Sequence, residues 1–137
     1  MASHRSFARR VLLWIPSLGC AALIFYLSSQ SDPMPGLTTL VWDKALHATE
    51  YGLLTVLLCR AWRGEGCGWL TASVLGLVVA SMYALTDEWH QGFVAGRNSD
   101  LHDWLADSVG GFIGAAGYWI AGGRTWLHAA EREGTIS

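Results

Sequence analysis

The sequence has few charged residues, few cysteines and few prolines, and it lacks the short motifs of common hydrolases and nucleotide-binding proteins. Only 15% of its 137 residues are Asp, Glu, Lys or Arg, with three cysteines and three prolines. The cysteines lie in apolar stretches and one loop, so they suggest neither a disulfide framework nor a paired-cysteine metal site. There is no serine-elbow motif, phosphate-binding glycine loop or HExxH pair. The sequence therefore predicts no standard nucleophile or nucleotide site.

Apolar residues are abundant instead, and they form long blocks. They make up 52% of the chain. Four blocks each have roughly the 17 to 20 residues that an α-helix needs to cross a hydrocarbon core of about 30 Å. These blocks cover 11–27, 45–62, 69–85 and 104–121. Since four segments are too few for a spanning β-barrel, we predict an all-α protein, a four-helix transmembrane bundle in contact with membrane lipids.

The predicted bundle forms one domain over residues 1–123, with a tail at 124–137. Its helices are expected at about 11–27, 45–62, 69–91 and 101–121. The glycine-rich stretch at 63–68 predicts a tight turn between the second and third helices. A signal peptide is the alternative for the first block, because arginines precede it. The apolar run continues well past Cys20, which favours a retained helix.

Basic residues are unequally divided between the two sides of such a bundle. Seven arginines lie on the side that holds both chain ends and the 63–68 turn, namely Arg5, Arg9, Arg10, Arg60, Arg63, Arg124 and Arg132. The opposite side has only Lys44 and Arg97. The positive-inside rule therefore predicts cytoplasmic termini and places the other two loops outside. The outer side is acidic, so we expect no nucleic acid as a partner.

Polar residues recur at helical spacing on three of the predicted helices. One face of the second helix carries, at positions i, i+4, i+7 and i+8, Asp43, His47, Glu50 and Tyr51. The fourth helix repeats this spacing with Asp103, Asp107 and Gly110. On the third helix, Asp87 and Gln91 continue a stripe of small residues and tyrosine. The three helices are expected to share a seam that is closely packed at depth and polar toward the outside.

Depth in the membrane distinguishes some of these residues from ordinary solvated side chains. His47, Glu50 and Asp107 fall within the predicted spans, where an ionisable group is costly and normally faces a partner or performs a task. A structural polar network is the alternative explanation for all three. Nearer the helix ends, Asp87 and Glu88 fit a solvated surface equally well.

Two stretches of the chain resemble a known family. They are DKALHATEY at 43–51 and DEWHQGFVAGRNSDLHDWLADSVGGFIG at 87–114, with LSSQ at 27–30 before them. In this order they resemble the VanZ-like family, small bacterial membrane proteins named after a protein linked to teicoplanin resistance. The matching positions are Asp43, Lys44, His47, Glu50, Tyr51, Asp87, Glu88, Gln91, Arg97, Asp103 and Gly110. Asp107 departs from the usual Asn of the family pattern, which adds a negative charge when it is ionised.

The resemblance implies a multi-pass protein of the bacterial inner membrane with a role in the cell envelope or in glycopeptide resistance. It implies no particular reaction. Carried onto the matching positions and Asp107, it implies a polar site at the outer face of the membrane.

Charge around this seam limits the mechanisms. Seven acids gather there, namely Asp43, Glu50, Asp87, Glu88, Asp100, Asp103 and Asp107, against the two bases Lys44 and Arg97. In a low-dielectric pocket this excess must be compensated by protonated carboxyl groups, a protonated His47 or a bound cation.

Three hypotheses follow. In the first, the site binds or acts on a lipid-linked envelope precursor or a glycopeptide. Arg97 would bind its phosphate or carboxylate, with acid-base chemistry from His47, Glu50 or Asp103.

The second is a metal-dependent membrane enzyme, in which a divalent ion is bound by His47, Glu50, Asp103 and Asp107. The third is non-enzymatic, either an ionic network or a small proton-linked transporter. The absence of an obvious nucleophile favours binding or resistance.

Overall fold

The computed structural model describes residues 7–31, 40–97 and 99–132, with the side chains of 40–42 and 123–132 left out. This part of the chain is all-α and contains no strand. The helices are α1 (Phe7–Ser28), α2 (Leu40–Gly64), α3 (Trp69–Gln91) and α4 (Leu101–Arg132). The predicted all-α class with four helices is thus confirmed. The backbone of α4 continues beyond the predicted end at 121, so the predicted tail begins as helix, and residues 133–137 lie outside the described part.

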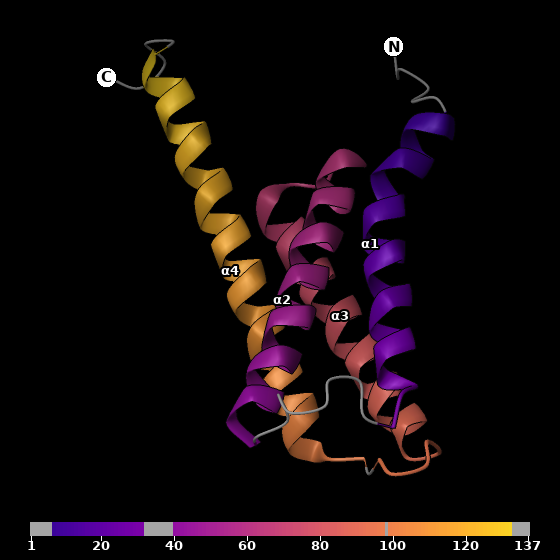
Figure 1. The fold of residues 1–137 in the computed structure, drawn as a ribbon. Coiled ribbons are helices and arrows are strands. Elements are labelled where there is room, and N and C mark those ends of the chain that lie inside the picture. The colour runs from indigo at the N-terminus through magenta and orange to yellow at the C-terminus, as the bar shows by residue number, and fades with distance from the viewer. Residues whose placement is uncertain (1–6, 32–39, 98, 133–137) are drawn as a thin grey trace.

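Helix α2 is the centre of the bundle and packs against each of the other three helices. Helix α3 also packs along α4, whereas α1 lies mainly against α2 and touches α3 only slightly. Helix α1 begins and α4 ends at the same end of the bundle (Figure 1). The last turns of α4 project away from the other helices.

The contact between α2 and α4 depends on residues without bulky side chains. A Cβ added at Gly110 would lie 2.0 Å from the carbonyl oxygen of Ala48, and one at Gly114 would lie 2.5 Å from that of Gly52. The two backbones therefore approach so closely that only glycine fits on α4 at these two positions. The face of the fourth helix that carries Gly110, predicted to lie in a closely packed seam, is the face that packs against α2.

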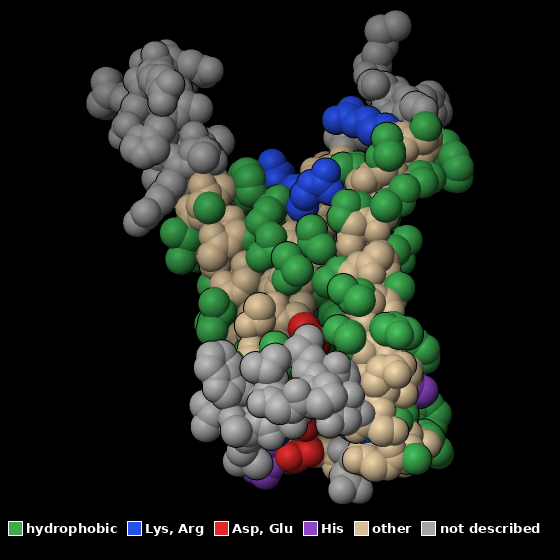
Figure 2. Space-filling model, viewed as in Figure 1, with side chains coloured by type: hydrophobic (Ala, Val, Ile, Leu, Met, Phe, Trp, Pro, Cys, Tyr) green, Lys and Arg blue, Asp and Glu red, His purple; other side chains and the backbone are tan. Residues whose placement is uncertain are grey.

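Large apolar side chains lie mostly on the outside of the bundle. On α1, α3 and α4 they include Leu12, Leu18, Tyr26, Leu70, Met82, Trp89, Phe112 and Ile113. Figure 2 shows hydrophobic side chains along the helix walls, with Lys and Arg toward one end of the bundle. Exposed apolar surface of this extent is typical of a protein that contacts lipid or a partner. Among the described residues, Phe7–Ser28 and Trp69–Gln91 are long and apolar enough to cross a membrane.

Two connections require glycine for conformational reasons. Gly66, in the turn between α2 and α3, has φ of 104°, and Gly96, between α3 and α4, has φ of 81°. Both values lie in the left-handed region, which residues with a Cβ adopt only at a cost. The first confirms the tight turn predicted at 63–68. The second shapes the loop that carries Arg97 back over the bundle.

Candidate functional site

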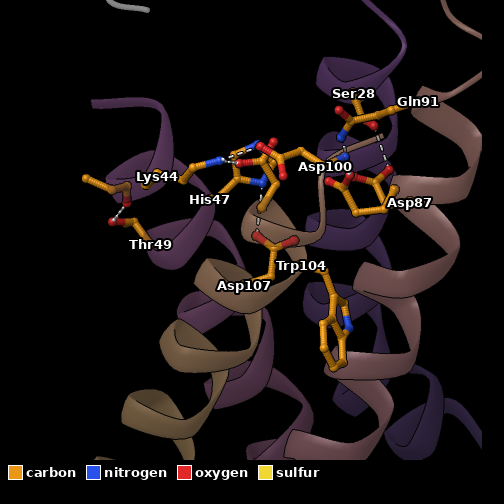
Figure 3. A network of polar contacts seen from close by, with 12 residues as sticks. Ser28, Lys44, His47, Thr49, Asp87, Gln91, Asp100, Trp104 and Asp107 are labelled. Atoms are coloured by element: carbon orange, nitrogen blue, oxygen red, sulfur yellow. Dashed lines mark hydrogen bonds and ion pairs between the residues drawn. The ribbon is translucent and has the colours of Figure 1, made fainter. Parts of the chain in front are cut away.

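Polar side chains from all four helices meet at the end of the bundle where α1 and α3 finish and α2 and α4 begin (Figure 3). His47 and Asp107 form the deepest contact between them. The Nδ1 of His47 lies 2.9 Å from Oδ1 of Asp107, and both side chains are buried. A ring N–H donating to a carboxylate at this distance is a charge-assisted hydrogen bond. It ties α2 to α4 one turn away from the Gly110 contact.

A second contact joins α1 to α3 through a buried carboxylate. The Ser28 hydroxyl donates to Oδ1 of Asp87 at 2.6 Å, and Nε2 of Gln91 donates to Oδ2 at 3.1 Å. All three side chains are buried. Each oxygen of Asp87 therefore has a hydrogen-bond donor, which offsets part of the cost of burying the carboxylate.

Nearer the surface, Lys44 neutralises acids of α4 and of the loop before it. Its ammonium group forms an ion pair with Asp103 and lies 3.3 Å from Oδ2 of Asp100. Asp100 also accepts hydrogen bonds from the backbone N–H of His102 at 2.9 Å and from its ring Nδ1 at 2.8 Å. The backbone and ring donors of His102, together with Lys44, lower the pKa of Asp100 to about 2. Asp100 is thus a carboxylate at any ordinary pH.

Two further contacts hold the loop between α3 and α4. Oε2 of Glu88 accepts from the backbone N–H of Asp100 at 2.9 Å. The Nε of Arg97 donates to the carbonyl oxygen of Gln30, just beyond α1, at 3.2 Å. These two hydrogen bonds attach the loop to α3 and to the segment just beyond α1. They hold Arg97 over that end of the bundle.

A small pocket opens beneath Arg97. Its polar lining consists of Ser28, Asp43, His47, Glu50, Asp87, Gln91 and Arg97. Its volume is about 40 Å³. Since one water molecule needs about 10 to 15 Å³ on the same measure, the pocket has room for a few waters or one small ion. It is too small to enclose a sugar or a peptide.

The structure brings the predicted site residues together, although they come from separate helices. Gly110 packs against Ala48, and six of the other eleven line the pocket, namely Asp43, His47, Glu50, Asp87, Gln91 and Arg97. Four lie in the surrounding network, namely Lys44, Glu88, Asp103 and Asp107. The last, Tyr51, is buried deeper in α2, and its hydroxyl has no partner among the described residues.

Metal-ligand geometry differs from the set expected from the sequence. Within the described chain, two groups of three side chains could hold an ion, the first being Asp43, His47 and Asp103. The second is His47, Glu88 and Asp107. Glu50 belongs to neither group and faces the pocket instead. The expected four ligands therefore do not meet as one set, because Asp103 and Asp107 fall in different groups and Glu50 falls in neither.

A family model described as VanZ/LLP1 matches residues 3–122. The chain belongs to the VanZ/LLP1 family. Together with the two apolar helices, this membership indicates association with a membrane. No curated protein and no solved structure matches the chain. Family membership thus agrees with the resemblance of the motifs, and it names neither a ligand nor a reaction.

Some contacts of this VanZ/LLP1-family site were not predicted from the sequence. Ser28 and the carbonyl of Gln30 take part in it, and the only signal for them was the LSSQ stretch that belongs to the family resemblance. Asp100 was expected only as one of the acids around the seam, and the structure adds its contact with Lys44. His90 makes a further contact: it is half-buried, and its Nε2 lies 3.1 Å from the Ser29 hydroxyl oxygen.

Proposed function

We propose that this VanZ/LLP1-family chain is a multi-pass protein of the bacterial inner membrane whose outward-facing pocket recognises the anionic group of an envelope ligand. The ligand is a lipid-linked envelope precursor or a glycopeptide of the teicoplanin type. Both present a phosphate or a carboxylate beside many hydroxyl and amide groups. Recognition of that group would contribute to envelope maintenance or glycopeptide resistance.

The lengths and faces of the helices support four membrane spans. At 1.5 Å per residue, the 25 residues of α2 and the 32 of α4 extend to about 37 Å and 48 Å, more than the hydrocarbon thickness of about 30 Å. Their ionisable residues at depth, His47 and Asp107, face each other inside the bundle. Inward-facing charges of this kind are the arrangement that a spanning helix tolerates.

The distribution of bases supports the proposed orientation. Arg9 and Arg10 of α1 and Arg60 and Arg63 of α2 lie at the end opposite the pocket. The side chains of Arg5, Arg124 and Arg132 lie outside the described part of the structure. An excess of arginine on one side favours the cytoplasm for that side, which leaves the pocket facing out.

The hydrogen bonding of the Arg97 side chain is the observation that carries the proposal. Its side chain makes one hydrogen bond within the described chain, from Nε to the Gln30 carbonyl, and its terminal amino groups have no acceptor among the described residues. A guanidinium that lines a pocket and keeps both terminal amino groups available suits bidentate binding of a phosphate or carboxylate. Asp43 and Glu50 in the same lining would accept hydrogen bonds from hydroxyl or amino groups beside that anion.

Pocket size restricts how the ligand binds. With about 40 Å³ available, only a small polar part of the ligand enters, while its bulk stays at the membrane surface. A lipid-linked or membrane-associated ligand suits this geometry, because the bilayer already holds it at the right height.

Drug sensitivity of cells provides the test. Expression of the chain in a teicoplanin-sensitive Gram-positive host should raise the minimal inhibitory concentration, and Arg97→Ala should abolish the increase. Arg97→Lys should retain part of it, since the charge stays but the bidentate fork is lost. Arg60→Ala, at the far end of the bundle, is the matched control and should behave as the parent.

Folding must be measured beside resistance. If Arg97→Ala and Glu50→Gln fold normally and leave glycopeptide sensitivity unchanged, the proposal is wrong. If both variants instead mainly lower thermal stability, the cluster is an ionic network that holds the bundle.

A further inference from the structure

Three ionisable side chains from three different helices meet inside the bundle. They are His47 of α2, Glu88 of α3 and Asp107 of α4, and their exposed fractions are only 7%, 3% and 2%. One possible ligand atom from each lies within 4.8 Å of the other two. Only the fold brings them together, since 41 residues separate His47 from Glu88 and 60 separate it from Asp107.

In each of the two carboxylates, Glu88 and Asp107, one oxygen accepts a hydrogen bond within the described chain and the other accepts none. Oε2 of Glu88 accepts from the Asp100 backbone, and Oδ1 of Asp107 accepts from His47. The other oxygens, Oε1 of Glu88 and Oδ2 of Asp107, are fully buried and have no hydrogen-bond partner within the described chain. A buried acceptor left without a partner is costly, and more so when it carries charge. The group therefore lacks a positive partner.

Within the described part of the chain, no lysine or arginine side chain supplies that partner. Lys44 pairs with Asp103 and Asp100, and no lysine or arginine of the described chain forms an ion pair with Glu88 or Asp107. Protonation of His47 would add one positive charge against two carboxylates. A divalent cation would balance both carboxylates and satisfy both unpaired oxygens.

We propose that His47, Glu88 and Asp107 bind one divalent metal ion of the Zn²⁺ or Mn²⁺ class. One imidazole nitrogen with two carboxylate oxygens is a mixed donor set that suits these ions, whereas Mg²⁺ and Ca²⁺ prefer oxygen ligands alone. Three protein ligands leave coordination positions for water. His47 also lines the pocket beneath Arg97, whose 40 Å³ accommodates such waters.

The neighbouring group of Asp43, His47 and Asp103 is the weaker candidate. Asp103 is already neutralised by the Lys44 ammonium, and Asp43 is only half-buried. A cation there would have to compete with Lys44 and with water. In the group with Glu88 and Asp107, all three side chains are buried, and neither carboxylate is paired with a lysine or arginine of the described chain.

Metal analysis of the purified full-length protein tests the inference. The protein in detergent is stripped with a chelator, dialysed against Zn²⁺, Mn²⁺ or Mg²⁺, and measured by mass spectrometry of the elements. We expect one Zn²⁺ or Mn²⁺ per chain, with at least about tenfold weaker binding in Glu88→Gln and in Asp107→Asn. The ion should also raise the melting temperature of the parent and leave that of Asp107→Asn unchanged.

Matched variants make every outcome decisive. Glu65→Gln removes a carboxylate at the opposite end of the bundle and should bind like the parent. Size-exclusion profiles and tryptophan fluorescence check that each variant is folded. Three results would overturn the inference: substoichiometric metal in the parent, preference for Mg²⁺, or loss of binding in Asp43→Asn with normal binding in Glu88→Gln. The assay contains no envelope ligand, so its outcome is independent of the resistance test.

Discussion

The close approach of α2 and α4 can be tested with one methyl group, by changing Gly110 to alanine. The added Cβ would lie 2.0 Å from the carbonyl oxygen of Ala48 and 2.6 Å from its carbonyl carbon. Both are backbone atoms, so no side-chain rotation removes the overlap. The helices must separate by about 1 Å to bring the 2.0 Å distance to 3.0 Å, the lower limit of real contacts.

The expected cost follows from this overlap. Overpacking costs about 1 to 3 kcal/mol, and a backbone clash belongs at the upper end. The better helix propensity of alanine offsets about 1 kcal/mol of this cost. The free energy of unfolding should therefore fall by about 2 kcal/mol. Gly117 of the same helix is the control, because a Cβ there meets nothing within 4 Å. Gly117→Ala should therefore be neutral or stabilising.

The same separation should disturb the polar site. His47 and Asp107 lie within one turn of the crossing, and an added 1 Å would lengthen their contact from 2.9 Å to about 3.9 Å, beyond hydrogen-bond range. In detergent, tryptophan fluorescence should show a melting temperature lower by roughly 8 °C for Gly110→Ala. Equal melting temperatures for the Gly110 and Gly117 variants would refute the packing argument.

Three further results are expected. Ser28→Ala should lower the free energy of unfolding by about 1 to 3 kcal/mol in chemical denaturation, because a buried oxygen of Asp87 loses its donor. An unchanged free energy of unfolding would show that water replaces the hydroxyl. Ser99 is exposed, and a cysteine is introduced there in a background without the native cysteines. This cysteine should react with a membrane-impermeant thiol reagent in intact spheroplasts. Protection from the reagent would reverse the proposed orientation. The carboxyl carbon of Asp100 should titrate near pH 2 by NMR, since the His102 donors and Lys44 lower its pKa. The stabilising contribution of Asp100 is then present above pH about 4 and lost as the pH falls toward 2. An NMR titration midpoint near 4 would mean that the contacts with His102 and Lys44 do not form.

Periodicity was sufficient to predict which polar residues of α2 face inward. The i, i+4 and i+7 spacing of Asp43, His47 and Glu50 allowed one face to be assigned to them, and all three line the pocket. Periodicity says nothing about the height or rotation of one helix against another. The expected metal-ligand set therefore included Glu50, whereas the structure brings Glu88 beside His47.

The sequence by itself determined the all-α class, the number of helices, their polar faces and the family. These properties are local, because they follow from hydropathy, from spacing along one helix and from the order of motifs. Tertiary structure decided which acids are neutralised and which are left buried without a partner. That outcome depends on the register between helices, set at contacts such as Gly110 against Ala48. Those contacts place Asp103 beside Lys44 but leave an oxygen of Asp107 without a partner among the described residues.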